Sequence, residues 1–324
     1  MKPGPRAASV AAILLASACA AMTTAQPVET TTIQPVRMET RSVPLGPGGA
    51  TLAPGVLYAG GLSLHGASLH GLSDLKLAGD GSGAWAVSDF GHLIRFEIRT
   101  DAQGKLVGAD TATRRALAGL DGEYLGAGKG DSDAEGLALL DDGRLLVSFE
   151  RDNRIWSYGP EGAETPVPVR HPDVAFPGNE GMEGLSSAPD QDGRPAWLVL
   201  GEAGGAWTCT VIACRALPDV PTRIDDGYMF TSADRDPAGG WFVLERYYQP
   251  PLTLRARIRR MAADGSLGPP LITLRPPASV DNFEGIAVHA TPMGARLYIL
   301  SDDNDIFLQK TLLLAFDVEA RPAR

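Results

Sequence analysis

Short apolar stretches separated by polar, turn-forming residues make up most of this chain, and beyond the N-terminal run no segment holds a helical period for long. A typical stretch runs from Arg144 to Phe149 after an Asp-Asp-Gly turn. A polar stop and a second apolar stretch, Arg154 to Tyr158, follow it. Short β-strands bounded by turn residues produce this pattern, so we expect an all-β fold.

The same unit recurs along the chain. Three copies begin with Glu-Gly followed by Leu or Ile, at Glu135, Glu183 and Glu284, and two degenerate copies begin near Asp74 and Asp234. The anchors lie about 50 residues apart, after a longer first step of about 60. A period of this size with several short strands predicts a β-propeller, whose blades bury their faces on one another. A β-sandwich would explain the strands but not the recurring motif.

The number of blades depends on the segment from Val43 to Leu64. It either completes the last blade beside the C-terminal strand near Thr311 to Val318, or belongs to a sixth blade. The long first step contains the Gly-rich stretch Gly122 to Gly130, which leaves room for an extra element. We therefore favour six blades over five, with the ring closed by N- and C-terminal strands.

The N-terminus predicts export. Lys2 and Arg6 precede the apolar run Ala7 to Ala21, which is followed by small residues, so residues 1–25 fit a signal peptide. Residues 26–54, rich in Pro, Thr and Gly, are expected to be a linker, and residues 55–324 a single domain. Cys19 offers a lipoprotein alternative, but Ala16 stands where a lipobox usually has Leu. We favour a periplasmic or secreted protein with no transmembrane segment.

The remaining cysteines agree with export. Cys209 and Cys214 could face each other across a short hairpin, and a disulfide there suits an oxidising compartment. Two free thiols in a strand are the alternative.

The formal net charge of -10 argues against a nucleic-acid partner, because phosphate binding needs clustered Lys and Arg. It also disfavours a polyanionic substrate unless a cation is bound in the site.

Repeated carboxylates are the candidate chemistry. Equivalent points of propeller blades converge near the axis, so Glu135, Glu183 and Glu284 should meet on one face. Clustered carboxylates repel unless a hard cation or Arg lies between them, and Ca²⁺, with six to eight oxygen ligands, suits such a surface. The alternative is that each Glu accepts backbone N–H bonds from the next blade as a structural clip.

A second set of acids stands at strand ends, and two of its members are followed by Arg151 and Arg246. The five acids are Asp89, Glu150, Glu202, Glu245 and Asp302. Asp89 and Asp302 join the predicted metal ligands, and either Arg could grip a phosphate or carboxylate. An interblade salt bridge is the alternative role for each Arg. No serine elbow is present, no organic cofactor is expected, and His65 and His70 are interpreted as loop residues.

Taken in order, the motifs resemble those of the phytase-like domain family, also called the "esterase-like activity of phytase" family. The matching segments are Asp133–Leu137, Glu150–Arg151, Asn179–Leu185, Val243–Arg246, Asn282–Ile286, Ser301–Asn304 and Gln309–Thr311. The resemblance covers about Gly60 to Val318 and implies an exported bacterial β-propeller that hydrolyses phosphoric or carboxylic esters. The chain lacks the Asp-x-Asp-Asp-Pro-Ala-x-Trp motif of β-propeller phytases, so phytate itself is not the predicted substrate.

The sequence therefore predicts a metal-assisted ester hydrolase. Its catalytic residues would be Glu135, Glu183, Glu284, Arg151 and Arg246, acting in a monomer on a small-molecule ester or phosphate ligand. A non-catalytic ligand- or partner-binding propeller of the cell envelope and a lactonase-like hydrolase are the alternatives.

Overall fold

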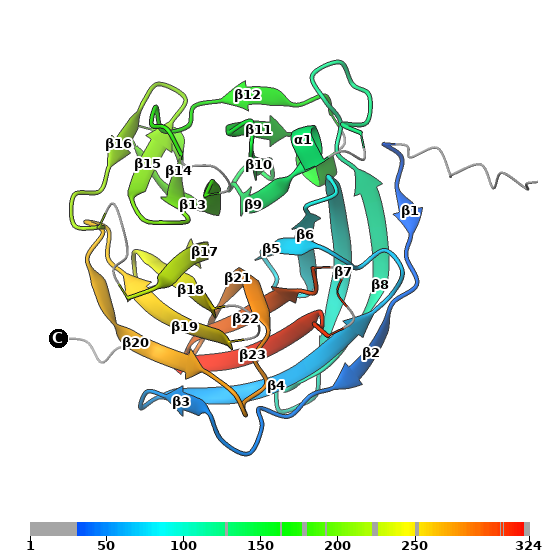
Figure 1. Cartoon of the computed structure of the whole chain (residues 1–324), viewed down its shortest axis with the longest axis vertical. Coiled ribbons are helices and arrows are strands. Elements are labelled where there is room, and N and C mark those ends of the chain that lie inside the picture. The colour runs from blue at the N-terminus through cyan, green and yellow to red at the C-terminus, as the bar shows by residue number, and fades with distance from the viewer. Residues whose placement is uncertain are drawn as a thin grey trace, which may run out of the picture.

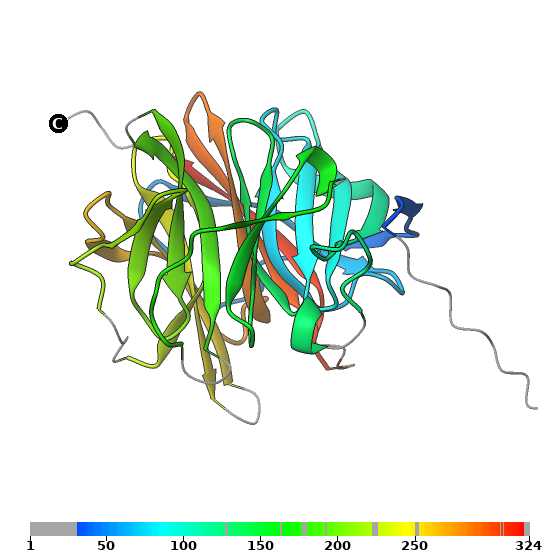
Figure 2. The same ribbon diagram turned by 90° about the horizontal axis from the view of Figure 1, so that it is seen from above.

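Five antiparallel sheets surround a common axis in the computed structural model, which describes residues 31–320 except 127–128, 163, 177–179, 192, 222–225, 250–252, 305 and 307 (Figure 1). The all-β propeller prediction is confirmed. Seen from the side, the strands of each blade run from one face of the ring to the other (Figure 2). The expected signal peptide, with Cys19, lies outside the described residues.

The strands of each blade are named in order from the axis outward. Blade 1 is β5 (Leu72–Leu77), β6 (Gly83–Ser88), β7 (His92–Thr100), β8 (Leu106–Ala116) and β1 (Gln34–Pro35). Blade 2 is β9 (Ala134–Leu139), β10 (Leu145–Phe149), β11 (Arg154–Tyr158) and β12 (Val167–Val169). Blade 3 is β13 (Met182–Gln191), β14 (Arg194–Gly201), β15 (Ala206–Thr210) and β16 (Cys214–Ala216).

The last two blades also take strands from the N-terminal part of the chain. Blade 4 is β17 (Tyr228–Arg235), β18 (Trp241–Gln249), β19 (Thr253–Met261), β20 (Leu267–Leu274) and β3 (Ala50–Leu52). Blade 5 is β21 (Asn282–Thr291), β22 (Gly294–Asp302), β23 (Leu312–Glu319), β4 (Val56–His65) and β2 (Glu39–Ser42). The helix α1 (Lys129–Ser132) and a 3₁₀ turn (Pro160–Gly162) lie in the connections.

The described residues form five blades, so the preference for six is corrected. The segment from Val43 to Leu64 supplies β4, which pairs with the C-terminal strand β23 and closes the ring. The long first step is taken up by the 11-residue strand β8 and by the connection that carries α1, not by a further sheet. The predicted closure by N- and C-terminal strands is confirmed.

Part of the expected linker is built into the ring. The strands β1, β2 and β3 add an outer edge to blades 1, 5 and 4 by pairing with β8, β4 and β20. Blades 2 and 3 lack such a strand among the described residues and end at the three-residue strands β12 and β16.

The hydrophobic core is divided among the interfaces between blades. One cluster joins Leu72 of blade 1 to Leu313 of blade 5, and another joins Val87 of blade 1 to Leu137 of blade 2. The other three clusters lie between blades 2 and 3, 3 and 4, and 4 and 5. Each sheet thereby buries both faces, which explains why the repeat needs neighbours on either side.

A buried ion pair fills the axis. Lys76 Nζ bonds to both carboxylate oxygens of Asp74 at 2.9 Å and donates to the Ile286 carbonyl of blade 5 at 3.2 Å. Asp74 also accepts from Ser232 Oγ of blade 4 at 2.6 Å and from Leu137 N of blade 2 at 2.8 Å. Burial raises the pKa of Asp74 to about 6, although Lys76 opposes the shift. Four blades are therefore tied together at this point.

The predicted disulfide is confirmed. Cys209 and Cys214 are joined across the hairpin of β15 and β16, where they are paired residues in the ladder. Within the described part of the chain, no helix is long and apolar enough to cross a membrane.

Candidate functional site

Every blade carries a β-bulge at the same place on its innermost strand. In each of the five inner ladders one extra residue lies on the inner strand near its start. A bulge re-aims the side chain at that point, here toward the axis. The bulged positions are Ser73, Glu135, Glu183, Thr231 and Glu284.

This register corrects two anchors of the repeat. The predicted Glu135, Glu183 and Glu284 are equivalent, but in the degenerate copies the equivalent residues are Ser73 and Thr231. Asp74 and Asp234 lie further along their strands, where both accept interblade hydrogen bonds.

The second strand of each blade contributes one further residue to the site. The last regular pairs before the bulges are Leu72–Ser88, Ala134–Phe149, Met182–Gly201, Phe230–Glu245 and Phe283–Ser301. The residues that follow these partners are Asp89, Glu150, Glu202, Arg246 and Asp302.

The fourth member of this second set is therefore Arg246, and the assignment of Glu245 to it is wrong. Because neighbouring residues of a strand point to opposite faces, Glu245 points to the face opposite to that of Arg246. It is fully buried and accepts two bonds from Arg257, from Nε at 2.6 Å and from Nη2 at 2.8 Å. Glu245 thus belongs to a structural ion pair.

Apart from Thr231, the residues of both sets line one cavity of about 250 Å³. Its charged residues are Asp89, Asp133, Glu135, Glu150, Glu183, Glu202, Glu284, Asp302, Arg151 and Arg246, and Ser73 and Asn304 complete the lining. The structure therefore brings together all seven residues predicted as catalytic or metal-binding. Eight carboxylates against two guanidinium groups leave a surplus of six negative charges when all are ionised.

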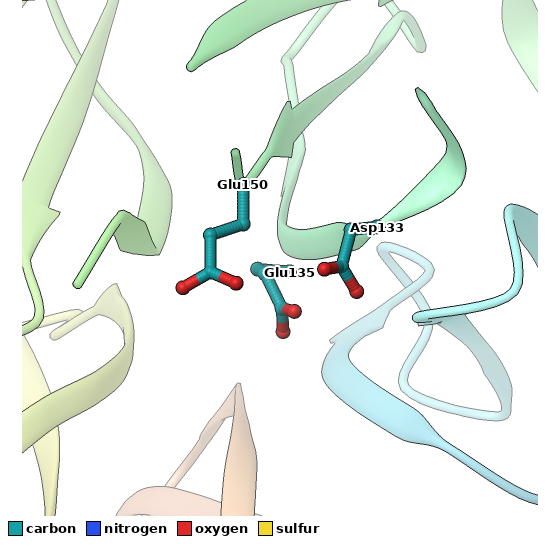
Figure 3. A group of neighbouring side chains, drawn as sticks. All are labelled: Asp133, Glu135 and Glu150. Atoms are coloured by element: carbon teal, nitrogen blue, oxygen red, sulfur yellow. The ribbon is translucent and has the colours of Figure 1, made fainter. Parts of the chain in front are cut away.

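Three of the carboxylates form a group that could hold a metal ion. Asp133, Glu135 and Glu150 each offer an oxygen, and these oxygens lie within 4.8 Å of one another. Their side chains point into the same space (Figure 3). Glu150 N donates to the Asp133 carbonyl at 2.9 Å, which ties the strand end to the segment before β9. An all-oxygen set suits a hard cation such as Ca²⁺.

The electrostatics also favour a cation. Burial, reinforced by the charges of Glu183 and Glu284, raises the pKa of Glu135 well above its usual range. Burial and the charge of Glu202 do the same for Glu183, and burial and the charge of Glu284 for Asp302. Protons or a bound cation can relieve the repulsion between these carboxylates.

Among the described residues, Glu135 and Glu183 are not interblade clips, whereas Glu284 is bonded to Arg246 of blade 4. Within the described residues, no group donates a hydrogen bond to Glu135 or Glu183. Contacts between blades are made instead by neighbours such as Ser148, whose Oγ donates to the Met182 carbonyl at 2.7 Å. Thr231 makes the corresponding contact to the Phe283 carbonyl at 3.2 Å.

The glycines after Glu135 and Glu284 are required by close blade packing. A Cβ added to Gly136 would lie 2.7 Å from the Glu183 carbonyl oxygen, and one added to Gly285 would lie 2.8 Å from Leu75 N. Both contacts cross a blade boundary, so the Glu-Gly motif combines a carboxylate for the cavity with a close approach for the ring.

The two arginines have different surroundings. Arg246 binds Glu284 and Asn282 through Nη1, and Glu202 through Nη2 at 2.9 Å. Although burial opposes it, the charges of Glu284 and Glu202 raise the pKa of Arg246. The predicted alternative of an interblade salt bridge therefore describes Arg246.

Arg151 is 42% exposed and donates through Nε to Asp133 at 2.7 Å. Its backbone has φ 64°, a left-handed conformation that costs a side chain energy. A guanidinium is thus kept at the cavity rim in spite of the backbone cost.

Asp133 was not proposed as a ligand from the sequence, and Glu150 was noted only as a strand-end acid. The spacing Asp133-x-Glu135 was the available signal, but in a regular strand it would not have implied a shared site with Glu150. The bond between Glu150 N and the Asp133 carbonyl became visible only in the structure.

A comparison with models of protein families identifies a family. The family model described as "Phytase-like: Esterase-like activity of phytase" matches residues 67–305. No curated protein matches the sequence.

Among solved structures, a protein provisionally described as a gluconolactonase is 14% identical, with 88% of this chain and 94% of that chain covered and a TM-score of 0.46. The Malassezia sympodialis allergen Mala s 1 is 13% identical, with 88% and 95% covered and a TM-score of 0.45. A luciferin-regenerating enzyme is 12% identical, with 79% and 96% covered and a TM-score of 0.40. Likenesses at this level carry no inference about function.

Proposed function

The chain belongs to the phytase-like family with esterase-like activity, and from that premise we propose that it is an exported, metal-assisted hydrolase of phosphoric or carboxylic esters. The proposed active site is the carboxylate cavity on the propeller axis. Small-molecule esters are the expected substrates.

The observation that carries the proposal is the group formed by Asp133, Glu135 and Glu150 inside a cavity with a large surplus of negative charge. A cavity of this charge would repel a phosphate ester unless a cation were bound there. Glu135 and Glu183 also have unused acceptor oxygens, since no described residue donates to them. The donor set therefore fits a hard divalent ion, for which we propose Ca²⁺.

Asp133, Glu135 and Glu150 would hold the ion, with Glu183, Glu284, Asp89 and Asp302 available around them. When bound, Ca²⁺ would supply Lewis-acid polarisation of the phosphoryl or carbonyl oxygen and neutralise developing negative charge.

The chain's own residues orient the substrate. Arg151, anchored by Asp133 through Nε, can present its remaining N–H groups to an anionic oxygen of the substrate. Arg246 is already bound to Glu202, Glu284 and Asn282, so its role is to hold these side chains in place.

A second candidate function is a non-catalytic propeller that binds a small ligand or partner in the cell envelope. In the described lining of the cavity, Ser73 is the only hydroxyl side chain, and neither His nor Cys is present. A hydroxyl nucleophile from this lining would have to be Ser73, which has no His beside it among the described lining residues. A lactonase-like hydrolase would differ from the main proposal only in its substrate.

Hydrolysis by chelator-treated, mature protein distinguishes these functions. The panel is p-nitrophenyl phosphate, p-nitrophenyl acetate and a simple lactone, each assayed with and without added Ca²⁺. We expect Ca²⁺ to restore hydrolysis of at least one phosphate or carboxylic ester, and Glu183→Gln to lower the rate about 100-fold. Glu39→Gln, an exposed residue on β2, is the matched control and should retain full activity. Full activity after chelation would contradict the metal role, and inertness toward the whole panel would favour the binding function.

A further inference from the structure

A second and larger cavity, of about 580 Å³, lies between blades 5 and 1. It is formed by the end of β4, the segment leading into β5, and the connection from β22 to β23, all of which belong to these neighbouring blades (Figure 1). The polar side chains on its wall include His65, His70, Asp303, Gln309 and Lys310. A polar alcohol would therefore find hydrogen-bond partners in it.

His70 and Asp303 form a fixed pair in the wall of this cavity. His70 Nδ1 lies 2.7 Å from Asp303 Oδ2, so the ring nitrogen donates to the carboxylate. Gly71 N donates to the other oxygen of Asp303 at 3.4 Å, and Thr311 Oγ1 lies 3.2 Å from Oδ2. Asp303 is nearly buried, whereas the His70 side chain is 41% exposed. The arrangement holds the imidazole by Nδ1, and no described residue forms a hydrogen bond with Nε2.

The same pair borders the carboxylate cavity. Asp303 stands in the chain between Asp302 and Asn304, which both line that cavity. His70 precedes Gly71, and a Cβ added to Gly71 would lie 2.0 Å from Asp89 Oδ1, so the Asp89 carboxylate packs directly on this backbone. The two cavities therefore share a wall that contains the His70–Asp303 pair.

From this geometry we propose that His70 is the general acid that protonates the leaving-group oxygen of the ester, and that the larger cavity receives the alcohol. Asp303 is its positioning residue. The inference rests on the proposed hydrolase function and adds to it a proton donor and a site for a polar alcohol. Histidine is suited to this role because it changes charge near neutral pH.

The proposed step balances in atoms and protons. As water attacks phosphorus, the new P–O bond forms and the bond to the alcohol oxygen breaks. The departing oxygen takes the Nε2 proton of the His70 imidazolium ion and leaves as the neutral alcohol, and His70 becomes a neutral imidazole. The proton released by the water then returns the imidazole to its starting state through solvent, while Asp303 keeps the Nδ1 proton in place throughout.

The dependence of the rate on the leaving group tests this role. Chelator-treated protein reloaded with Ca²⁺ is assayed with p-nitrophenyl phosphate, whose leaving group needs no proton, and with glycerol 2-phosphate, whose leaving group needs one. We expect His70→Gln to lower kcat for glycerol phosphate by about 100-fold and for p-nitrophenyl phosphate by less than about fivefold. Asp303→Asn should give the same selectivity with a smaller loss. His171→Gln, at an exposed histidine outside both cavities, should change neither rate.

Equal losses on both substrates in His70→Gln would indicate a structural role and overturn the proposal, as would no loss on either. If His70→Gln fails to fold, as judged by its circular dichroism melt, Asp303→Asn decides by the same criterion. Wild-type protein that hydrolyses neither substrate would overturn the proposed phosphoric-ester hydrolase together with this inference. Active wild type with an unchanged substrate ratio in the variants overturns the inference alone.

Discussion

Arg246 Nη2 bonds to Glu202 Oε1 at 2.9 Å across the boundary between blades 4 and 3. The two residues occupy equivalent positions in their blades, one place after the partner of the last regular pair before the bulge. A cation has thus replaced an acid at one of five equivalent points, and it also binds Glu284 of blade 5. This substitution relieves part of the repulsion that the repeat creates.

Replacing Arg246 should therefore destabilise the protein in the absence of metal. In Arg246→Gln the carboxylates of Glu202 and Glu284 lose their partner while remaining nearly buried, and removing one side of such a pair costs about 3–5 kcal/mol. Urea unfolding of chelator-treated protein measures the loss. The exposed pair of Arg37 and Glu39 provides the control, since Arg37→Gln should change the free energy of unfolding by less than about 0.5 kcal/mol. Equal effects of the two variants would show that the Arg246 pairs contribute no more than surface pairs.

In the fourth blade, the sequence did not predict which side chain faces the axis. The strand 241–246 and its terminal acid were visible in the sequence, but which of Glu245 and Arg246 faces the axis depends on the bulge at Thr231. A shift of one residue exchanges the two faces of a strand, and sequence periodicity does not locate such a shift in a single degenerate copy. In the three complete copies the Glu-Gly pair itself marks the bulge, so the sequence identifies equivalent positions in those blades.

Two glutamates of similar burial should respond in opposite directions to the same substitution. Glu183→Gln removes a buried carboxylate that neighbouring carboxylates repel, so it should stabilise the metal-free protein by about 1 kcal/mol. The same substitution should weaken Ca²⁺ binding. Glu245→Gln breaks the bond to Arg257 and should destabilise the protein by about 3 kcal/mol without changing Ca²⁺ binding. Urea unfolding with and without Ca²⁺ measures both effects. A destabilised, metal-free Glu183→Gln would mean that Glu183 is a structural clip after all.

The stability of the metal-free protein should fall as pH rises. Glu135, Glu183 and Asp302 have pKa values raised by burial and by neighbouring carboxylates, and burial raises the pKa of Asp281 to about 6. A raised folded-state pKa contributes stability that is complete below the ordinary carboxylate pKa of about 4 and is lost as pH rises through the folded value.

Because protons and Ca²⁺ compete for the same oxygens, the increase in Tm on adding Ca²⁺ should be larger at pH 7.5 than at pH 5.5. Differential scanning fluorimetry at the two pH values, with Ca²⁺ or with chelator, measures both effects. A metal-free Tm that rises from pH 5.5 to 7.5, or a Ca²⁺ effect independent of pH, would contradict this interpretation of the cavity.

Alanine at the glycines of the motif should loosen the contacts between blades. Gly136→Ala would place a Cβ 2.5 Å from Ser148 Oγ and 2.7 Å from the Glu183 carbonyl, and we expect a loss of about 2–3 kcal/mol. Gly79→Ala has no atom within 4 Å of the new Cβ and should be neutral or slightly stabilising. Thermal unfolding of both variants gives the comparison. An unchanged Tm in Gly136→Ala would show that the blades can move apart without loss of stability.

Contacts between distant segments were the other limit of the sequence. Ring closure between β4 and β23 could be anticipated, but whether β4 completed a blade or began a new one depended on long-range pairing. His70 and Asp303 are separated by 233 residues, and His70 was interpreted only as a loop residue. Periodicity predicts the blades because it is local, whereas pairs formed by closing the ring have no local signal.

A Ca²⁺ titration of chelator-treated protein, measured by isothermal titration calorimetry, tests most directly whether the carboxylate cavity holds a divalent cation. We expect saturable binding with a dissociation constant on the order of 10⁻⁴ M or below, weakened at least about tenfold in Glu135→Gln. Absence of saturable binding at millimolar Ca²⁺, or binding that is unchanged in Glu135→Gln, would contradict it.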